Sequence, residues 1–291
     1  MIRGAITALA LPFKNGEIDE ESYRRHIEWQ IEQGIHGLVP CGTTGESATL
    51  SHEEHERAIK ICIDQVKGRV PVIAGSGSNN TTEAIRLTKF AKQAGADAAL
   101  LITPYYNKPT QEGIFRHFET IAKEVSLPMV VYNVPGRTGS NVLPATMVRM
   151  YREIPEVIGV KEATGNLIQI SNILENVDDK FILLSGDDFT VLPSLSLGAK
   201  GVISVTANIM PHSMAAMVDA WDAGNVAEAR RLHFLMEPVN RAMFLESNPI
   251  PVKYSLHRMG RFSDEIRLPM TVLAEKFRPQ LEEVLTNAGL I

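Results

Sequence analysis

The stretch 157-VIGVKEATG-165 combines an apolar strand, a charged end and a turn. Val157–Val160 is typical of a strand buried on both faces, and Lys161 follows it directly. The small and polar residues Ala163–Asn166 suit a tight turn into a helix. The stretch therefore predicts a strand, a βα loop that begins at Lys161, and a helix. Without its context, a lysine at position 161 would indicate only that the strand ends at the solvent-exposed surface.

The same strand-then-helix pattern recurs along the chain. Eight apolar, β-rich runs are predicted strands: Gly4–Leu9, Gly37–Pro40, Val70–Ala74, Ala98–Ile102, Met129–Tyr132, Val157–Val160, Phe181–Leu184 and Gly201–Ser204. Amphipathic helical stretches lie between them, among them Glu20–Gln33, His52–Val66, Thr82–Ala94 and Gln111–Val125. Eight such units predict parallel strands joined by crossover helices, and the number eight favours an α/β fold closed as a (β/α)8 TIM barrel.

The strand signals stop near Asn225. The helical stretches that follow are "NVAEARRLHFLMEPVNRAMF", "VKYSLHRMG" after a break at "SNPIP", and a last helix over Met270–Asn287. We therefore expect residues 1–224 to form the catalytic barrel. Residues 225–291 are expected to form a C-terminal helical region that packs on the barrel or on another subunit.

Composition narrows the possible partners and compartment. The 291 residues are 44% hydrophobic and 22% charged, which is typical of a globular protein with a sizeable core. The net charge of −5 and the lack of a basic run argue against nucleic acid. Two cysteines, Cys41 and Cys62, have neither metal-like spacing nor enough partners for a disulfide framework, which fits a reducing cytoplasm. The N-terminal apolar run is too short for a membrane span and is broken by Pro12, so it predicts a first strand rather than a signal peptide.

Reactive residues follow the predicted strands. In a TIM barrel the active site lies at the carboxyl ends of the strands, so these segments should come together. Besides Lys161 they are "GTTGES" (42–47), "TPYYNKP" (103–109), "NVPGRTG" (133–139), "SGDD" (185–188) and "VTAN" (205–208).

Lysine in this position suggests covalent catalysis. An amine held in a water-poor barrel mouth loses solvation of its charged form and becomes a better nucleophile, able to form a Schiff base with a keto acid. Tyr132 ends the neighbouring strand and could exchange protons with the intermediate, although a structural role is its plain alternative. The GTTG glycines would let backbone N–H groups approach a carboxylate. Arg137 offers a forked donor for a second carboxylate, with a surface arginine as the alternative.

Two other motifs carry weaker signals. "GSGSNN" (75–80) is glycine-rich but lacks dinucleotide-binding spacing, so nucleotide binding stays a weak alternative. "HEEH" places His52 and His55 only three apart, which is not the H-E-x-x-H zinc pattern. Neither a metal nor an organic cofactor is therefore expected.

The assembled motifs resemble the pyruvate-dependent class I aldolases, the family of dihydrodipicolinate synthase and N-acetylneuraminate lyase. The resemblance covers essentially the whole chain, through "GTTGESATL", "PYYNKPTQEG", "YNVPGRTG", "GVKEATGN" and "NPIPVK". It implies that Lys161 forms the Schiff base and that Tyr132, Thr43 and Tyr106 form a proton relay, with Tyr106 supplied by a neighbouring subunit of a homotetramer. It further implies substrate contacts from these residues: Thr43 and Thr44 to the pyruvate carboxylate, Arg137 to the second substrate, and Gly186 and Ile203 through their backbone.

The implied reaction is the Schiff-base condensation of pyruvate with L-aspartate-4-semialdehyde, the lyase step that opens diaminopimelate and lysine biosynthesis. This assignment within the family depends on Arg137 in "VPGRTG" and Tyr106 in "PYYN". The nearest alternative is a sister aldolase acting on another aldehyde, such as a sugar-acid or hydroxy-oxoglutarate lyase. A non-catalytic 2-oxo-acid sensor is a third possibility.

Further polar residues are left unused by catalysis. Serine and asparagine near helix starts usually cap the helix, and histidines three apart on an exposed face are usually only solvated. In lysine-inhibited members of the resembling family, however, the matching positions form an allosteric lysine pocket at a subunit interface. The positions here are Ser47, Ala48, His52, His55, Asn79, Glu83 and Tyr105. The resemblance therefore implies feedback inhibition by L-lysine.

Overall fold

A computed structural model describes residues 2–291 of the chain. These residues form two compact units. The first unit contains Pro71–Ile203, and the second joins Gly4–Val70 to Ser204–Ile291. The second unit thus groups the first strand with the C-terminal helices. The division at residue 224 that the sequence suggests stays a prediction. Among residues 2–291, no helix is both long and apolar enough to traverse a bilayer.

The main sheet has eight strands in the order β4-β1-β10-β9-β8-β7-β6-β5, with helices between them along the chain. Its strands are β1 Gly4–Ala8, β4 Gly37–Val39, β5 Ile73–Gly75, β6 Ala98–Ile102, β7 Met129–Asn133, β8 Val157–Glu162, β9 Ile182–Ser185 and β10 Gly201–Ser204. A short antiparallel hairpin, β2 Phe13–Lys14 with β3 Glu17–Ile18, stands apart from it. The architecture is the (β/α)8 TIM barrel, which confirms the predicted fold class.

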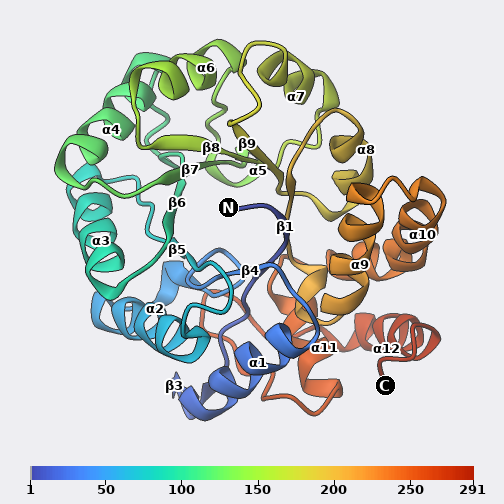
Figure 1. Cartoon of the computed structure of the whole chain (residues 1–291). Helices are drawn as coiled ribbons and strands as arrows, with labels where there is room; N and C mark the ends of the chain where they lie inside the picture. Colours follow the sequence, from blue (N-terminus) through green and yellow to red (C-terminus); the bar gives the residue numbers. More distant parts are fainter. Residues whose placement is uncertain (1) are drawn as a thin grey trace. The chain divides into compact units, whose positions relative to one another are not determined.

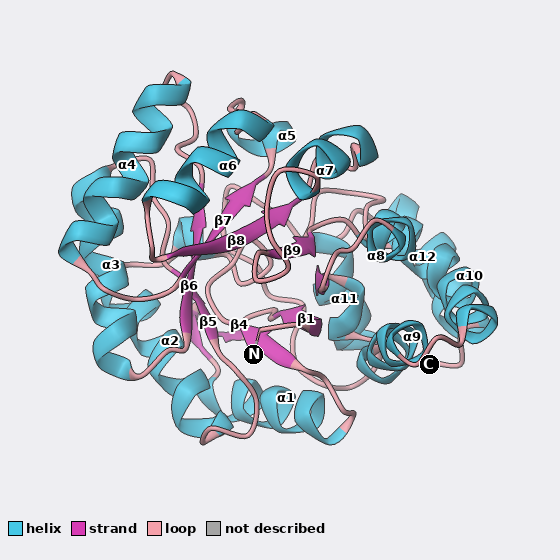
Figure 2. Ribbon diagram, turned by 45° about the horizontal axis from the view of Figure 1, so that its top comes forward, coloured by secondary structure: helices cyan, strands magenta, loops and turns pink. Residues whose placement is uncertain are grey.

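The first unit shows why apolar runs became strands. Strands β6 and β7 read AALLI and MVVYN and are almost wholly buried, because helices cover them. The helices are α3 Thr81–Ala94, α4 Gln111–Glu124, α5 Pro135–Thr138, α6 Pro144–Glu153, α7 Leu167–Leu174 and α8 Val191–Ser196. Figure 1 shows α3, α4, α6 and α7 on the outer side of β6 to β9, and Figure 2 shows the same helices beside the strands from a second direction.

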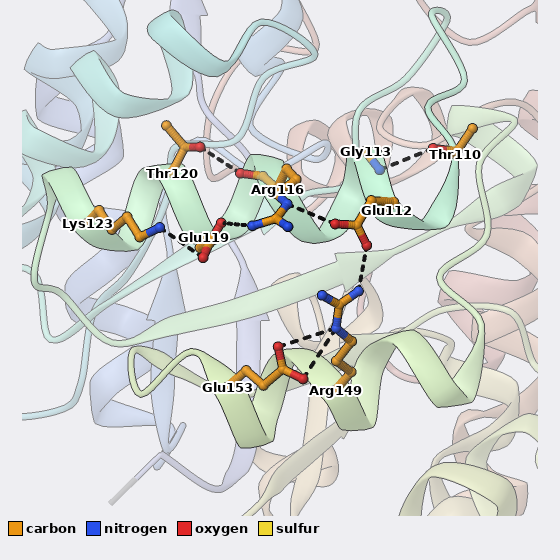
Figure 3. Close-up of polar contacts among 9 residues, drawn as sticks. All are labelled: Thr110, Glu112, Gly113, Arg116, Glu119, Thr120, Lys123, Arg149 and Glu153. Atoms are coloured by element: carbon orange, nitrogen blue, oxygen red, sulfur yellow. Dashed lines mark hydrogen bonds and ion pairs between the residues drawn. The ribbon is translucent and has the colours of Figure 1, made fainter.

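Ion pairs tie two helices of that outer layer together. The Arg149 guanidinium reaches from α6 to α4, where Nη1 lies 2.6 Å from Glu112 Oε2 (Figure 3). The same guanidinium lies 3.7 Å from the centroid of the Phe115 ring. Arg116 joins Glu112 to Glu119 along α4. Exposed pairs of this kind each contribute little to stability, so the buried apolar faces hold these helices.

The second unit consists mainly of helices. They are α1 Glu20–Glu32, α2 His52–Val66, α9 Pro211–Asp222, α10 Val226–Ala242, α11 Ile250–Arg258 and α12 Arg278–Asn287. Helix α2 begins with a capping box in which Ser51 and Glu54 each accept the other's backbone N–H. Helix α9 packs against both β1 and α10.

Several predicted boundaries are wrong; the third strand, for example, begins at Ile73 rather than at Val70. Strand β8 does not stop at Val160 but continues through Lys161 and Glu162, because both residues keep their pairing with β7 and β9. The last helix begins at Arg278 rather than at Met270. Pro279 fits the first turn of that helix, where the missing N–H is not needed, and the chain before it turns irregularly.

Candidate active site

Lys161 is buried at the end of β8 with only 5% of its surface exposed. Its Cα pairs in register with that of Tyr132 on β7, and its Nζ lies 4.2 Å from the centroid of the Tyr132 ring. The interpretation of Lys161 as a strand exit into solvent is therefore wrong. A buried amine is poorly hydrated, which suits a nucleophile, and the neighbouring phenol suits proton transfer.

Gly186 allows the next strand to approach this lysine closely. A Cβ built at Gly186 would lie 2.6 Å from the Ala163 Cβ and 3.0 Å from the Lys161 Cε, so any side chain would displace the lysine stem. The Gly186 N–H donates to the Glu162 carbonyl at 2.7 Å. On the neighbouring strand β10, Ile203 is 1% exposed.

A buried polar network holds the end of β8 from its other face, and the sequence interpretation missed it. Glu162 is 1% exposed; its Oε2 accepts from the Asn133 amide at 3.0 Å and from the Gln169 amide at 3.1 Å. Its Oε1 accepts from the Thr164 N–H at 2.9 Å. Asn133 in turn accepts from the Val142 N–H at 3.0 Å, beyond the Arg137 turn. Strand alternation was the available signal, because it directs residues 161 and 162 to opposite faces.

The loop after β6 presents Tyr106 to solvent. This side chain is 89% exposed, and its backbone has φ +71°, which is unfavourable for a tyrosine. The Tyr106 N–H donates to the Thr138 carbonyl at 3.3 Å, so the loop is tied to the turn that carries Arg137. Arg137 itself is exposed at the end of α5. Both side chains therefore lie at the surface.

In the second unit, the Gly42–Ser47 loop follows β4. Thr44 is 1% exposed, and its Oγ1 accepts from the Asn248 Nδ2 at 3.0 Å, while Thr43 is half-buried. Gly45 is needed for space, because a Cβ there would lie 3.1 Å from the Leu9 carbonyl oxygen. Sequence reasoning did not single out Asn248, which lies 204 residues from Thr44.

The residues that are expected to bind the inhibitor L-lysine belong partly to the first unit and partly to the second. In the first, the Asn79 Nδ2 donates to the Tyr105 carbonyl at 3.2 Å, and Glu83 accepts from the Ser78 hydroxyl. Asn79 does not cap α3, since that role belongs to Asn80.

In the second unit, Ser47 and Ala48 lie in a short 3-10 helix, and His52 begins α2. His55 is only 5% exposed, so the idea that both histidines share an exposed face is wrong. The His55 side chain lies on the buried face of α2 and is therefore shielded from solvent. Within the described residues 2–291, no three histidine, cysteine or acidic side chains cluster as metal ligands would.

Comparison with known proteins decides the family. The profile of the "Dihydrodipicolinate synthetase family" matches residues 1–288. The chain belongs to this family.

Dihydrodipicolinate synthetase relatives match it over their full length. The 4-hydroxy-tetrahydrodipicolinate synthase of Nitratidesulfovibrio vulgaris strain DP4 is 64% identical over 288 residues, which is 99% of either chain. The structure of dihydrodipicolinate synthase from Acinetobacter baumannii complexed with pyruvate superposes with a TM-score of 0.98 at 47% identity, covering 100% of both chains. The structure from Cyanidioschyzon merolae with lysine bound gives a TM-score of 0.96 at 39% identity and 99% coverage of both.

Proposed function

We propose that the chain condenses pyruvate with L-aspartate-4-semialdehyde, as a 4-hydroxy-tetrahydrodipicolinate synthase of diaminopimelate and lysine biosynthesis. Full-length curated relatives at 53–64% identity bear this name, and it is a lyase activity. Lys161, buried against the Tyr132 ring, is the observation in this chain that carries the chemistry. The deciding experiment is turnover with pyruvate and L-aspartate-4-semialdehyde, set beside other aldehydes.

Lys161 acts as the nucleophile in this proposal. Its amine adds to the ketone of pyruvate, and loss of water leaves an imine. Removal of a proton from the pyruvate methyl group then gives an enamine, whose carbon attacks the aldehyde and restores an imine. Attack on that imine by water or by the amino group of the semialdehyde expels the Lys161 amine and releases the product. Tyr132, Thr43 and Tyr106 relay the protons that these steps release and consume.

The remaining residues hold the two substrates. Thr43 and Thr44 donate to the pyruvate carboxylate, and the backbone of Gly186 and Ile203 lines the same site. Arg137 pairs with the carboxylate of the semialdehyde. The Acinetobacter baumannii relative complexed with pyruvate supports the choice of the first substrate.

The exposure of Tyr106 supports an assembly of several chains. An exposed tyrosine held in a strained backbone conformation is accessible to a neighbouring chain, which supports this role. We therefore propose a homotetramer built as a dimer of dimers, in which Tyr106 enters the adjacent active site. We also propose a cytoplasmic location, which agrees with the biosynthetic role.

Replacement of Arg137 by alanine should weaken use of the semialdehyde and spare pyruvate. Loss of a charge-assisted hydrogen bond worth about 1.5–3 kcal/mol should raise the KM for the semialdehyde roughly 10- to 100-fold. Adduct formation with pyruvate should be unchanged. Steady-state kinetics with both substrates measures the split, and Arg152→Ala, an exposed arginine of α6, is the matched control. Equal loss toward both substrates would remove Arg137 from this role.

L-Lysine is proposed as an inhibitor that does not compete with pyruvate. The Cyanidioschyzon merolae relative was crystallised with lysine bound, and Ser47, Ala48, His52, His55, Asn79, Glu83 and Tyr105 are the proposed contacts here. Tyr105 adjoins Tyr106, so a ligand there could bias the proton relay. Glu83→Ala should raise the half-inhibitory L-lysine concentration about tenfold, because it removes the carboxylate that pairs with an ammonium. Rates that stay flat up to millimolar L-lysine would contradict inhibition, and Glu119→Ala on α4 is the control.

The relatives favour this reaction over the sister aldolases and the sensor. A sugar-acid or hydroxy-oxoglutarate lyase would prefer its own aldehyde in the same panel, and a sensor would bind pyruvate without turnover. Either outcome would replace the proposal.

A further inference from the structure

The C-terminal helix α11 is bound to the Gly42–Ser47 loop by a buried ion pair. Lys253 on α11 meets Glu46, and their side chains are only 1% and 2% exposed. The second Glu46 oxygen accepts from the Arg267 N–H at 3.0 Å. Burial lowers the pKa of Lys253, while the Glu46 carboxylate opposes that shift. A buried ion pair whose hydrogen bonds are satisfied adds little net stability but fixes the relative position of its two partners. The pair therefore holds the loop against the helix.

The loop would not hold this shape by itself. Glu46 has φ +54°, a left-handed conformation that costs a residue other than glycine about 1–2 kcal/mol. The contacts from Lys253 and Arg267 stabilise Glu46 in this left-handed conformation. The residue two positions before Glu46 is Thr44, whose hydroxyl is thereby held at a constant position beside Asn248.

The Asn248 amide decides what the Thr44 hydroxyl can do. A threonine hydroxyl has one hydrogen to donate and two lone pairs to accept with. Because the Asn248 Nδ2 donates to Thr44 Oγ1, one lone pair is occupied and the hydroxyl hydrogen is available to an acceptor. A carboxylate is an acceptor only, so this arrangement presets Thr44 as a donor to an anion.

We infer that Asn248 is a positioning residue for pyruvate binding, which orients the Thr44 hydroxyl toward the substrate carboxylate from the segment just before α11. The inference rests on the proposed function, which assigns Thr44 to that carboxylate. It gives the C-terminal region a part in substrate affinity in addition to its packing role.

Two variants at one position test this. Asn248→Ala removes the donor and should raise the KM and the dissociation constant for pyruvate about 3- to 10-fold, as expected for one neutral hydrogen bond. Asn248→Asp keeps the shape but offers an acceptor, which captures the Thr44 hydrogen. Asn248→Asp should therefore raise the dissociation constant for pyruvate more than tenfold, which is a larger effect than that of Asn248→Ala. In both variants kcat at saturating pyruvate should fall by less than threefold. The dissociation constant is read from the pyruvate dependence of borohydride trapping.

Controls separate positioning from a general loss of structure. Tyr254→Phe removes a hydrogen bond from the following helix, α11, to Glu282, away from the loop, and should leave the pyruvate KM unchanged. If Asn248 acts through Thr44, then Asn248→Ala should add nothing to the pyruvate affinity already lost in Thr44→Val. Thermal unfolding of each variant verifies that the chain is folded.

The outcomes separate the positioning role of Asn248 from the proposed function of the protein. Trapping in the wild type with unchanged pyruvate affinity in both Asn248 variants would overturn the positioning role and leave the proposed function intact. Equal effects of alanine and aspartate, additive with Thr44→Val, would also overturn it. No adduct in the wild type would overturn both.

Discussion

Replacing Lys161 with alanine is expected to abolish the borohydride-trapped adduct with pyruvate and to lower kcat by about 10^4-fold or more, in the range seen when a covalent nucleophile is removed. The reason is that only an imine on the reacting amine becomes reducible. Lys161 is the buried lysine whose amine lies over the Tyr132 ring. Mass spectrometry of the digested protein locates the adduct, which should lie on the peptide that contains residue 161.

A matched control is an exposed lysine of the same unit. Lys180→Ala should trap pyruvate as the wild type does, because Lys180 lies at the surface before β9. An adduct on any other lysine, or one that survives Lys161→Ala, would remove the proposed mechanism.

Replacing Tyr106 with phenylalanine should lower kcat by roughly 10- to 1000-fold, which is the contribution of one link in general acid–base catalysis. The substitution removes only a hydroxyl and keeps the backbone bond from Tyr106 to Thr138, so folding should be unaffected. Steady-state kcat and thermal unfolding measure the two effects. Tyr151→Phe, which loses a hydroxyl bonded to Asp178 on the outer helix layer, is the control. A wild-type kcat in Tyr106→Phe would exclude this hydroxyl from the relay.

Mixing the two impaired variants tests whether Tyr106 serves a neighbouring subunit. In a mixed dimer of Lys161→Ala and Tyr106→Phe chains, one site would combine an intact Lys161 with an intact Tyr106 from its partner. Co-refolded mixtures should therefore be more active than the Tyr106→Phe parent, which is the more active of the two. If Tyr106 acted within its own chain, the activity of the mixture would not exceed the average of its parents.

The sequence by itself determined the repeating architecture. The periodicity of apolar residues is a local property, and it identified eight strands and the bounds of α2, because a strand or helix must bury its own apolar face. Parallel strands bring their carboxyl ends together, so the topology alone also pointed to Lys161 and Tyr132. Their Cα atoms do pair in register on β7 and β8.

Only the tertiary structure decided where polar groups are paired. Lys161 and Glu162 look like a solvent-exposed strand end in the sequence, yet both are buried, because their partners come from β7, β9 and α7. His55 looks exposed and is not. Lys253 and Glu46 are 207 residues apart, and no local pattern relates them. A buried charge or amide is tolerated only where a partner satisfies it, and that partner is chosen by the fold rather than by neighbours in sequence.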